Sequence, residues 1–208
     1  MKNIAMTSLC FISSLGLLSA CATQPVAEIT PVLEGNYVLD PTHARVNWSL
    51  SHAGLSQYTA RFDDVEGTLS FNANDPTQSR VDIRIDPNSV STGLEGFDKT
   101  LAESDRYFDA NTYPEIRFVS TSIRKTSETT GLITGDLTLR GVTKPITLDT
   151  TFNGAGKSFG NPGETLGFSA KGNFLRSDFG MTHLITLANI GDKITLNIEA
   201  EFNEAQDE

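Results

Sequence analysis

Hydrophobic and polar residues alternate along most of the chain, and two such runs meet within the segment 131–152. In the first run Ile133, Leu137 and Leu139 share one face, and the second repeats the pattern over residues 146–152. A period of two residues indicates a β-strand with one apolar side. The segment therefore predicts an antiparallel hairpin with one buried face.

Residues 140–145, between the two runs, contain the predicted turn. Gly141 tolerates positive φ, and Pro145 lacks the N–H that a central strand position donates. We therefore place Gly141 and Pro145 at the turn or at the first residue of a strand.

The same alternation recurs along the chain and predicts about eight strands. An all-β antiparallel fold follows, as a sandwich or a closed barrel, and even strand lengths in meander order favour an eight-stranded barrel without free edges. Such a barrel is filled by side chains or holds one slender ligand. The further one-sided runs span residues 37–40, 45–52, 65–71, 81–85, 116–118, 166–174 and 194–202.

Small residues occupy several inward positions of these runs. They would leave room along the barrel axis, so we expect an internal cavity; the alternative is that they relieve crowding at bends. These residues are Gly67, Gly135, Thr150, Ala170, Gly172 and Ala200.

One segment departs from the alternation. Thr92 and Glu95 have the spacing of a capping box, and Leu94, Phe97 and Leu101 follow at helical spacing. A second short turn is expected over residues 104–108. One or two short helices therefore interrupt the sheet.

The first 20 residues have the character of an export signal. Their apolar run over 4–18 is shorter than the ~20 residues of a membrane-spanning helix. Residues 18–21, LSAC, match a bacterial lipobox, which predicts acylation of Cys21; the alternative is an ordinary cleavage site. Because Ala22 rather than Asp follows, we expect a periplasmic protein with a lipid anchor in the outer membrane.

The remaining chain divides into a polar linker over 21–35, one globular domain over 36–203 and an acidic tail over 204–208. The formal net charge is −10, and loss of Lys2 with the signal would change it to −11. Such a charge disfavours nucleic acid as a partner. Loss of Cys10 with the signal would leave Cys21 as the one cysteine, so no intrachain disulfide is expected.

The three histidines, His43, His52 and His183, do not have the spacing of zinc ligands, and no metal site is expected. His52 falls in phase with the apolar face of its strand. Its imidazole would either hydrogen-bond a polar ligand group inside the barrel or be satisfied by a neighbouring core group.

Two pairs of charged residues admit a functional and a structural interpretation. Arg176 and Asp178 would pair or cap the barrel end, and Arg140 and Lys144 would receive a phosphate or form a solvated turn. The chain has no G-x-S-x-G, no H-E-x-x-H and no Gly-rich phosphate loop, so neither catalysis nor a cofactor is expected.

Short motifs, in order along the chain, resemble the YceI-like family of periplasmic lipid-binding proteins. The resemblance implies a lipocalin-like barrel whose apolar bore holds one polyisoprenoid chain, such as an isoprenoid quinone precursor or a polyprenyl phosphate. Thr100 departs from the His of many members. The motifs are YVLD at 37–40 with His43, SHAG at 51–54, SVSTG at 89–93 with Asp98 and Leu101, FD at 108–109, YP at 113–114, FVST at 118–121, GDLTLRGVTKP at 135–145 and RSDFGM at 176–181.

We therefore expect a protein that shields one polyisoprenoid lipid as a periplasmic carrier or store. The alternatives are a quinone-linked redox accessory, a structural or stress-related surface lipoprotein without a ligand, and, least favoured, a hydrolase; a homodimer stays open. The predicted ligand-contacting residues are Val46, Trp48, Leu50, His52, Val65, Leu69, Phe71, Ile83, Leu137, Leu148, Phe168, Phe174, Leu196 and Ile198.

Overall fold

The structure is a computed structural model that describes residues 34–206 except residue 159. The predicted signal, Cys21 and most of the linker lie outside these residues. The strands are β1 Gly35–Leu39, β2 Arg45–His52, β3 Ser56–Phe62, β4 Val65–Phe71, β5 Arg80–Ile85, β6 Val90–Ser91, β7 Ile116–Lys125, β8 Thr130–Leu139, β9 Val142–Gly156, β10 Thr165–Leu175 and β11 Lys193–Glu204. The helices are α1 Glu95–Glu103 and the 3₁₀ turns η1 Pro76–Gln78, η2 Pro87–Ser89 and η3 Arg176–Phe179.

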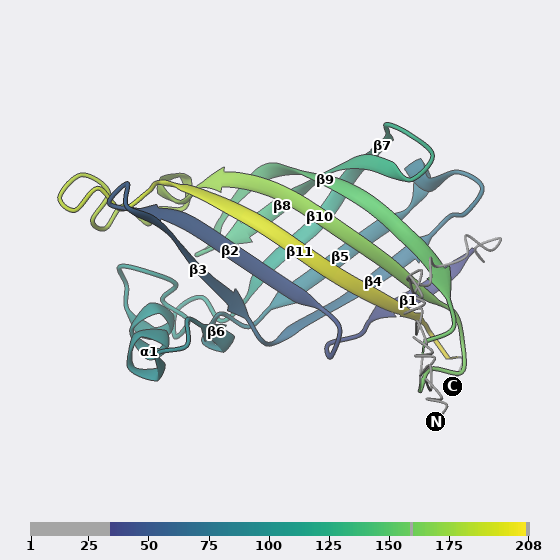
Figure 1. The fold of residues 1–208 in the computed structure, drawn as a ribbon, viewed down its shortest axis with the longest axis horizontal. Helices are drawn as coiled ribbons and strands as arrows, with labels where there is room; N and C mark the ends of the chain where they lie inside the picture. Colours follow the sequence, from purple (N-terminus) through teal and green to yellow (C-terminus); the bar gives the residue numbers. More distant parts are fainter. Residues whose placement is uncertain (1–33, 159, 207–208) are drawn as a thin grey trace, which may run out of the picture.

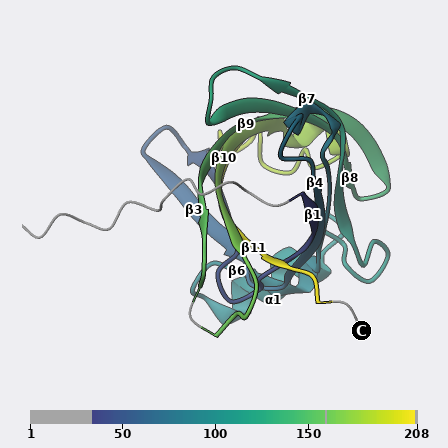
Figure 2. The same ribbon diagram turned by 90° about the vertical axis from the view of Figure 1, so that its right-hand side faces the viewer.

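Eight antiparallel strands form a closed barrel (Figures 1 and 2). The ring runs β1-β4-β5-β7-β8-β9-β10-β11 and closes where Tyr37–Leu39 pair with Phe202–Glu204. Closure gives each of these strands two neighbours, which removes the free edges of an open sheet. The predicted eight-stranded barrel is confirmed.

Strand β11 pairs along one edge with two strands in succession: its end with β1, and its earlier part with β2. The strands β2, β3 and β6 form a branch of the sheet that begins at this second pairing. Pro41 lies between β1 and β2, where the chain leaves one part of that edge and joins another. The sequence did not predict β3 or β6: β6 has two residues, and in β3 only Ala60 and Phe62 are buried.

The connection between β8 and β9 is shorter than the predicted six-residue turn. Arg140 and Gly141 alone form it, with φ of 52° and 71°, the backbone of a two-residue type I′ hairpin. Pro145 lies inside β9 opposite Asp136. The sheet tolerates it there because β10 pairs with β9 only from Leu148 onward, so the missing N–H falls on an edge without a partner strand.

One α-helix interrupts the strands, and the predicted second helix is a series of turns. The capping box was wrong. Leu94 is the N-cap residue and makes no side-chain cap, while the Thr92 backbone N–H and hydroxyl both donate to Asp98 Oδ1, at 2.7 and 2.5 Å. No helix within residues 34–158 or 160–206 is long and apolar enough to cross a bilayer.

Three inward glycines lie beneath large side chains of the adjacent strands. A Cβ on Gly67 would lie 2.5 Å from Ile83, one on Gly172 2.6 Å from Leu148, and one on Gly135 2.4 Å from the Phe118 ring. The glycines thus let these side chains lie flat against the barrel wall instead of crossing the interior. Relief of crowding and preservation of interior space are therefore one effect here.

Asp40 holds the break between β1 and β2 in place. Its carboxylate accepts hydrogen bonds from the Thr42 backbone N–H and hydroxyl and from Asn203, and it lies 3.0 Å from His43 Nδ1. Burial alone would raise the pKa of Asp40, but these hydrogen bonds outweigh it and hold the pKa well below its usual range.

We expect Gly135→Ala to lower the free energy of unfolding by about 1–3 kcal/mol, because the new methyl group displaces the Phe118 ring and the Val119 carbonyl. Chemical denaturation measures the change. Gly156→Ala is the control, because a Cβ there meets no atom within 4 Å. Equal stability of the two variants would contradict the packing described above.

We expect Asp40→Asn to lower the free energy of unfolding by about 1–3 kcal/mol at pH 7. A lowered folded-state pKa contributes stability that is complete above the unfolded-state pKa, near 4, and is lost as the pH falls through the folded-state value. Between pH 7 and pH 5 the difference between variant and wild type should grow, because protonated His43 has its Asp40 partner only in the wild type. From pH 5 toward pH 3 the difference should shrink, as Asp40 begins to lose its charge. A constant difference down to pH 3 would refute this assignment.

Candidate functional site

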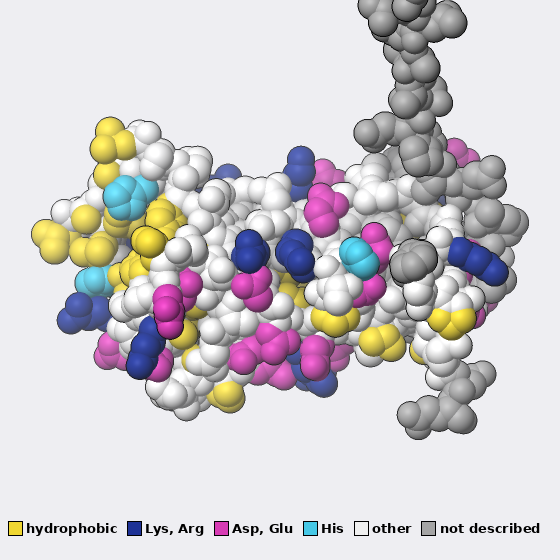
Figure 3. All heavy atoms as spheres, turned by 60° about the horizontal axis from the view of Figure 1, so that its bottom comes forward, with side chains coloured by type: hydrophobic (Ala, Val, Ile, Leu, Met, Phe, Trp, Pro, Cys, Tyr) yellow, Lys and Arg dark blue, Asp and Glu magenta, His cyan; other side chains and the backbone are white. Residues whose placement is uncertain are grey.

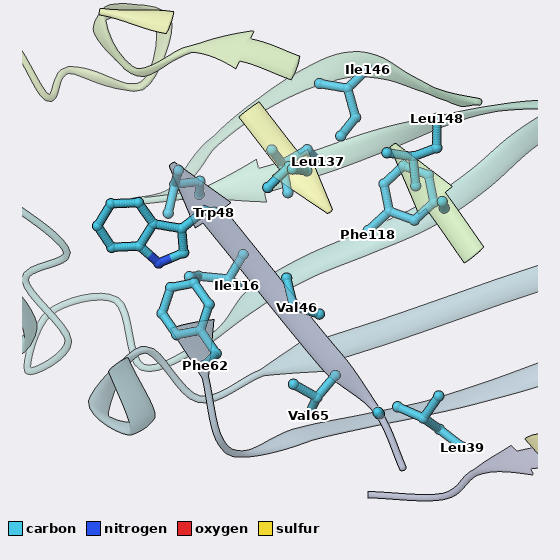
Figure 4. Packing of buried hydrophobic residues seen from close by; sticks show 14 of the residues in the cluster. Leu39, Val46, Trp48, Phe62, Val65, Ile116, Phe118, Leu137, Ile146 and Leu148 are labelled. Carbon is cyan, nitrogen blue, oxygen red and sulfur yellow. The ribbon is translucent and has the colours of Figure 1, made fainter. Parts of the chain in front are cut away.

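The barrel encloses an elongated cavity of about 410 Å³, within the range of about 300–1,000 Å³ that is usual for ligand pockets. Its wall is almost entirely aliphatic and aromatic. Figure 4 shows part of this wall, where Val46 and Trp48 of β2 and Phe118, Leu137 and Leu148 of the facing strands project into the same interior. A cavity of this shape and chemistry suits a slender apolar molecule.

Thirteen of the fourteen residues predicted to contact a ligand line this cavity. The remaining one, Phe71, lies behind the lining at the end near the termini, where its ring stacks on Phe152 at 6.3 Å between centroids and meets Phe168 edge-on. The thirteen are Val46, Trp48, Leu50, His52, Val65, Leu69, Ile83, Leu137, Leu148, Phe168, Phe174, Leu196 and Ile198.

Phenylalanines pack across the deep end of the cavity. Phe168 lies 5.3 Å from Phe152 and 5.9 Å from Phe202, centroid to centroid, and Phe71 completes the group. Edge-on and tilted aromatic pairs at these distances are favourable. The cavity therefore has a deep end formed by aromatic packing and a mouth at the opposite end of the barrel.

The mouth is formed by α1, the segment after it and the connection between β10 and β11. Tyr58 lies in β3, which was not predicted. The other residues lie in a helix and in irregular segments, where the alternation of the strands could not identify them; of these, Phe97 and Leu101 had a signal, their helical spacing. The mouth residues that were not predicted are Tyr58, Phe97, Leu101, Tyr107, Phe108, Arg176, Met181, His183, Leu184 and Ile190.

Aromatic rings form a collar around the mouth. Tyr58 contacts Phe97 edge-on at 6.0 Å, Phe97 contacts Tyr107 at 6.4 Å, and Tyr107 contacts the His183 ring at 5.5 Å. His52 lies 6.4 Å from Tyr58. The collar therefore places two phenol hydroxyls and two imidazoles at the entrance, whereas the wall below it is apolar.

His52 was predicted to face the barrel interior, and it lines the cavity, but at the mouth and not deep within the apolar wall. It is the last residue of β2, is exposed and lines the cavity only at its mouth. The phase of the strand was correct, because Val46, Trp48 and Leu50 precede it on the same side. Phase fixes the face of the sheet, but not the depth along the barrel axis.

Arg176 neither pairs with Asp178 nor lies in a strand. Arg176 is 4% exposed, and its guanidinium donates four hydrogen bonds of 2.8–3.1 Å to backbone carbonyls of the β10–β11 connection. Burial lowers its pKa, and Asp192 partly offsets this effect. The prediction that it caps the barrel end describes its position correctly. The acceptors are the carbonyls of Met181, His183, Ile190 and Gly191.

The side chain of Arg140 contacts the protein and is not simply solvated at the turn. Its guanidinium donates to the carbonyls of Asp105 and Tyr107 and lies 6.0 Å from the Tyr113 ring centroid. These contacts fasten the β8–β9 turn to the segment that carries Tyr107 and Phe108 into the mouth. Lys144 is exposed on β9.

Two buried polar atoms of the cavity wall lack a hydrogen-bond partner within the part of the chain that the structure describes. They are Trp48 Nε1, a donor, and Thr150 Oγ1, a donor and acceptor. A buried polar group without a partner costs free energy, so each is a point where a bound molecule or water can be held.

A histidine and two carboxylates meet outside the barrel end that carries β1. The nearest ligand-type atoms of Asp40, His43 and Glu201 all lie within 4.8 Å of one another. His43 Nδ1 is 3.0 Å from Asp40 and 3.9 Å from Glu201, and the hydrogen bond to Asp40 together with the charge of Glu201 raises the pKa of His43. The group is held by the hydrogen bond between His43 and Asp40 and by the charge of Glu201.

A closed antiparallel barrel with an apolar interior, entered through a mouth that carries polar groups, is typical of the class of lipocalin-like barrels. Comparison with known families then identifies the branch, because the YceI-like domain pattern matches residues 37–202. This chain belongs to the YceI-like family.

Relatives and solved structures agree with this assignment. A UPF0312 protein of Pseudomonas syringae is 39% identical over 151 residues, 72% of this chain and 78% of the relative. The Campylobacter jejuni YCEI protein is 34% identical with a TM-score of 0.64, over 73% of this chain and 88% of that one. Burkholderia cenocepacia BcnA shares the fold at 21% identity, with a TM-score of 0.68 over 78% and 98% of the two chains.

We expect Arg176→Met to lower the free energy of unfolding by about 2–4 kcal/mol, since four backbone carbonyls lose their donor in a buried site. Amide exchange should accelerate most in residues 181–191. Arg45→Met is the control, because Arg45 is exposed and its hydrogen bonds go to the carbonyls of the nearby residues Pro41 and Ala44. Unchanged exchange in the β10–β11 connection would contradict this role of Arg176.

Proposed function

We propose that the barrel binds a single polyisoprenoid lipid and shields its chain from water, acting as a carrier or store rather than as a catalyst. The observation that carries this proposal is the apolar cavity of about 410 Å³ inside a closed barrel. A structure with the same fold, 18% identical with a TM-score of 0.60 over 81% of this chain and 98% of that one, is described as a polyisoprenoid binding domain from Saccharophagus degradans implicated in plant cell wall breakdown.

The driving force of binding is the removal of apolar surface from water. A chain that buries roughly 400 Å² would gain on the order of 10 kcal/mol, from which the cost of ordering the chain and fixing its position is subtracted. Because the wall is almost wholly apolar, chain length and width determine selectivity more than polar contacts do. This favours a long unbranched or regularly methylated chain over a compact polar molecule.

The polar groups are arranged for a ligand with one polar end. Tyr58, Tyr107, His52 and His183 surround the mouth, so the polar end would remain there while the chain extends toward Phe168. Trp48 Nε1 supplies one unpaired donor below the collar, suited to a carbonyl or phenol oxygen. The candidates are an isoprenoid quinone precursor and a polyprenyl phosphate.

The expected location completes the proposal. Acylation of Cys21 would tether the protein to the outer membrane, with the barrel in the periplasm. This part of the proposal depends on the sequence of residues 1–21, which lie outside the described structure. Mass analysis of the mature protein from its native host tests the anchor directly.

Solvent extraction of protein purified from its native host, followed by mass spectrometry, tests the lipid itself. We expect about one polyisoprenoid molecule for each chain. Recovery of no lipid, together with no uptake of added polyprenyl lipid by the extracted protein, would refute the proposal.

We expect Ala170→Phe to weaken lipid uptake at least tenfold, because the new ring fills the cavity that Ala170 lines. Lys171→Phe adds the same ring at the next residue, which is exposed, and should leave uptake unchanged. The single tryptophan of the chain, Trp48, lies in the cavity wall, so its fluorescence reports binding. Equal affinities of the two variants would place the ligand outside the barrel.

A further inference from the structure

Two loop tips beside the mouth expose leucine side chains almost completely. Leu55, in the turn between β2 and β3, and Leu187, in the β10–β11 connection, are both 88% exposed, the highest values among the large hydrophobic residues that the structure describes as exposed. The β10–β11 connection forms the far tip of the molecule at the left of Figure 1, and hydrophobic side chains gather at that end in Figure 3. Both leucines lie outside the cavity lining.

The exposed positions are held by the backbone. Ala53 and Gly54 have φ of 55° and 73°, and the Leu55 N–H donates to the His52 carbonyl at 3.0 Å, which closes a tight turn. The Ala53 N–H donates to the Asn189 carbonyl at 3.1 Å and joins the two tips. These bonds fix the backbone of the turn that carries Leu55 and hold it beside the β10–β11 connection that carries Leu187.

The two loops that carry these leucines are also free of charge, in a chain with a formal charge of −10. Residues 46–60 and 179–191 contain no Asp, Glu, Lys or Arg, although one residue in five of the whole chain is charged. A rim without acidic groups approaches an anionic lipid surface without the repulsion that the rest of the molecule would meet. The apolar tips and the absence of charge thus coincide in these two loops, whereas α1 at the same end carries Glu95 and Asp98.

We propose that this rim, residues 53–55 and 184–190, docks on the surface of a lipid bilayer and inserts Leu55 and Leu187 between the headgroups. The inference rests on the proposed function, because it provides the route by which a lipid enters the cavity. Leu184 and Ile190 of the same loop line the cavity, so docking makes the membrane interior continuous with the apolar wall. The lipid chain then passes between bilayer and barrel without crossing water.

A bilayer fits this surface better than a protein partner does. Single side chains that protrude from loop tips enter a fluid interface without needing a complementary pocket. A stable protein interface buries about 1,000 Å² or more of matched surface, and the exposed apolar groups here are tips rather than a flat patch. Association through two leucines is weak and reversible, as repeated loading and unloading require.

Site-specific fluorescence tests the docking. The full chain with Cys10→Ala and Cys21→Ser would carry a bimane label at Ala188→Cys, which keeps both leucines, or at Thr68→Cys, an exposed residue of β4. With vesicles of phosphatidylethanolamine and phosphatidylglycerol, we expect a blue shift and quenching by brominated acyl chains at residue 188 and neither at residue 68. Equal responses, no response, or a shift that needs a second copy of the protein instead of vesicles would overturn the proposal.

Lipid transfer between vesicles tests the functional consequence. We expect Leu55→Glu combined with Leu187→Glu to slow transfer of a polyprenyl lipid by on the order of tenfold, while preloaded protein retains its lipid in solution. Val38→Glu, an exposed apolar residue of β1, should transfer at the wild-type rate. An unchanged rate in the double variant would refute docking. Absence of lipid uptake by every variant would instead refute the proposed function, and the label at residue 188 would still decide the docking.

Discussion

Closure of the sheet is the constraint on which the rest of this structure depends. The short pairing of β1 with β11 completes a ring in which every strand has a neighbour on each side. In a closed ring the alternation of side chains becomes an inside and an outside, so each strand sends its apolar face to one shared interior. The interior is then a space whose size follows from the number of strands and the side chains that enter it.

The interior stays open because its side chains lie along the wall. Ile83, Phe118 and Leu148 each cover a glycine of a neighbouring strand, which keeps their bulk close to the backbone. At the deep end rings pack against one another around Phe168 and Phe202, and at the mouth they form the collar. Large apolar side chains therefore line the wall where they cover a glycine, and close the end of the cavity where they face one another.

The mouth is organised by long-range polar contacts instead of strand pairing. Arg176 donates hydrogen bonds to four carbonyls of one loop, and Arg140 links the segment after α1 to the β8–β9 turn through two more. Guanidinium groups suit this task because their five N–H donors lie in one plane and point in several directions, and because the group stays charged. Their arrangement leaves the entrance framed by aromatic rings, with an uncharged rim at the loop tips.

Local alternation was sufficient to predict the strands of the ring, the inward faces and most of the cavity wall, because a period of two is a property of neighbouring residues. It could not place His52 at the mouth or Phe71 behind the lining, because phase carries no information on depth along the axis. It also missed β3, of which only Ala60 and Phe62 are buried, and β6, a two-residue strand that pairs with β3 at a distance in sequence.

The sequence by itself determined the fold family, the face that each ring strand buries and the absence of charge from two loops. The tertiary structure decided that those two loops lie side by side, that Arg176 serves carbonyls 5 to 15 residues away, and that a cavity remains between the walls. The physical reason is range. Hydrophobic periodicity is a property of residues that are neighbours along the chain. Closure of the barrel, the depth of a residue along its axis and the volume of the cavity are set only when strands distant in sequence meet.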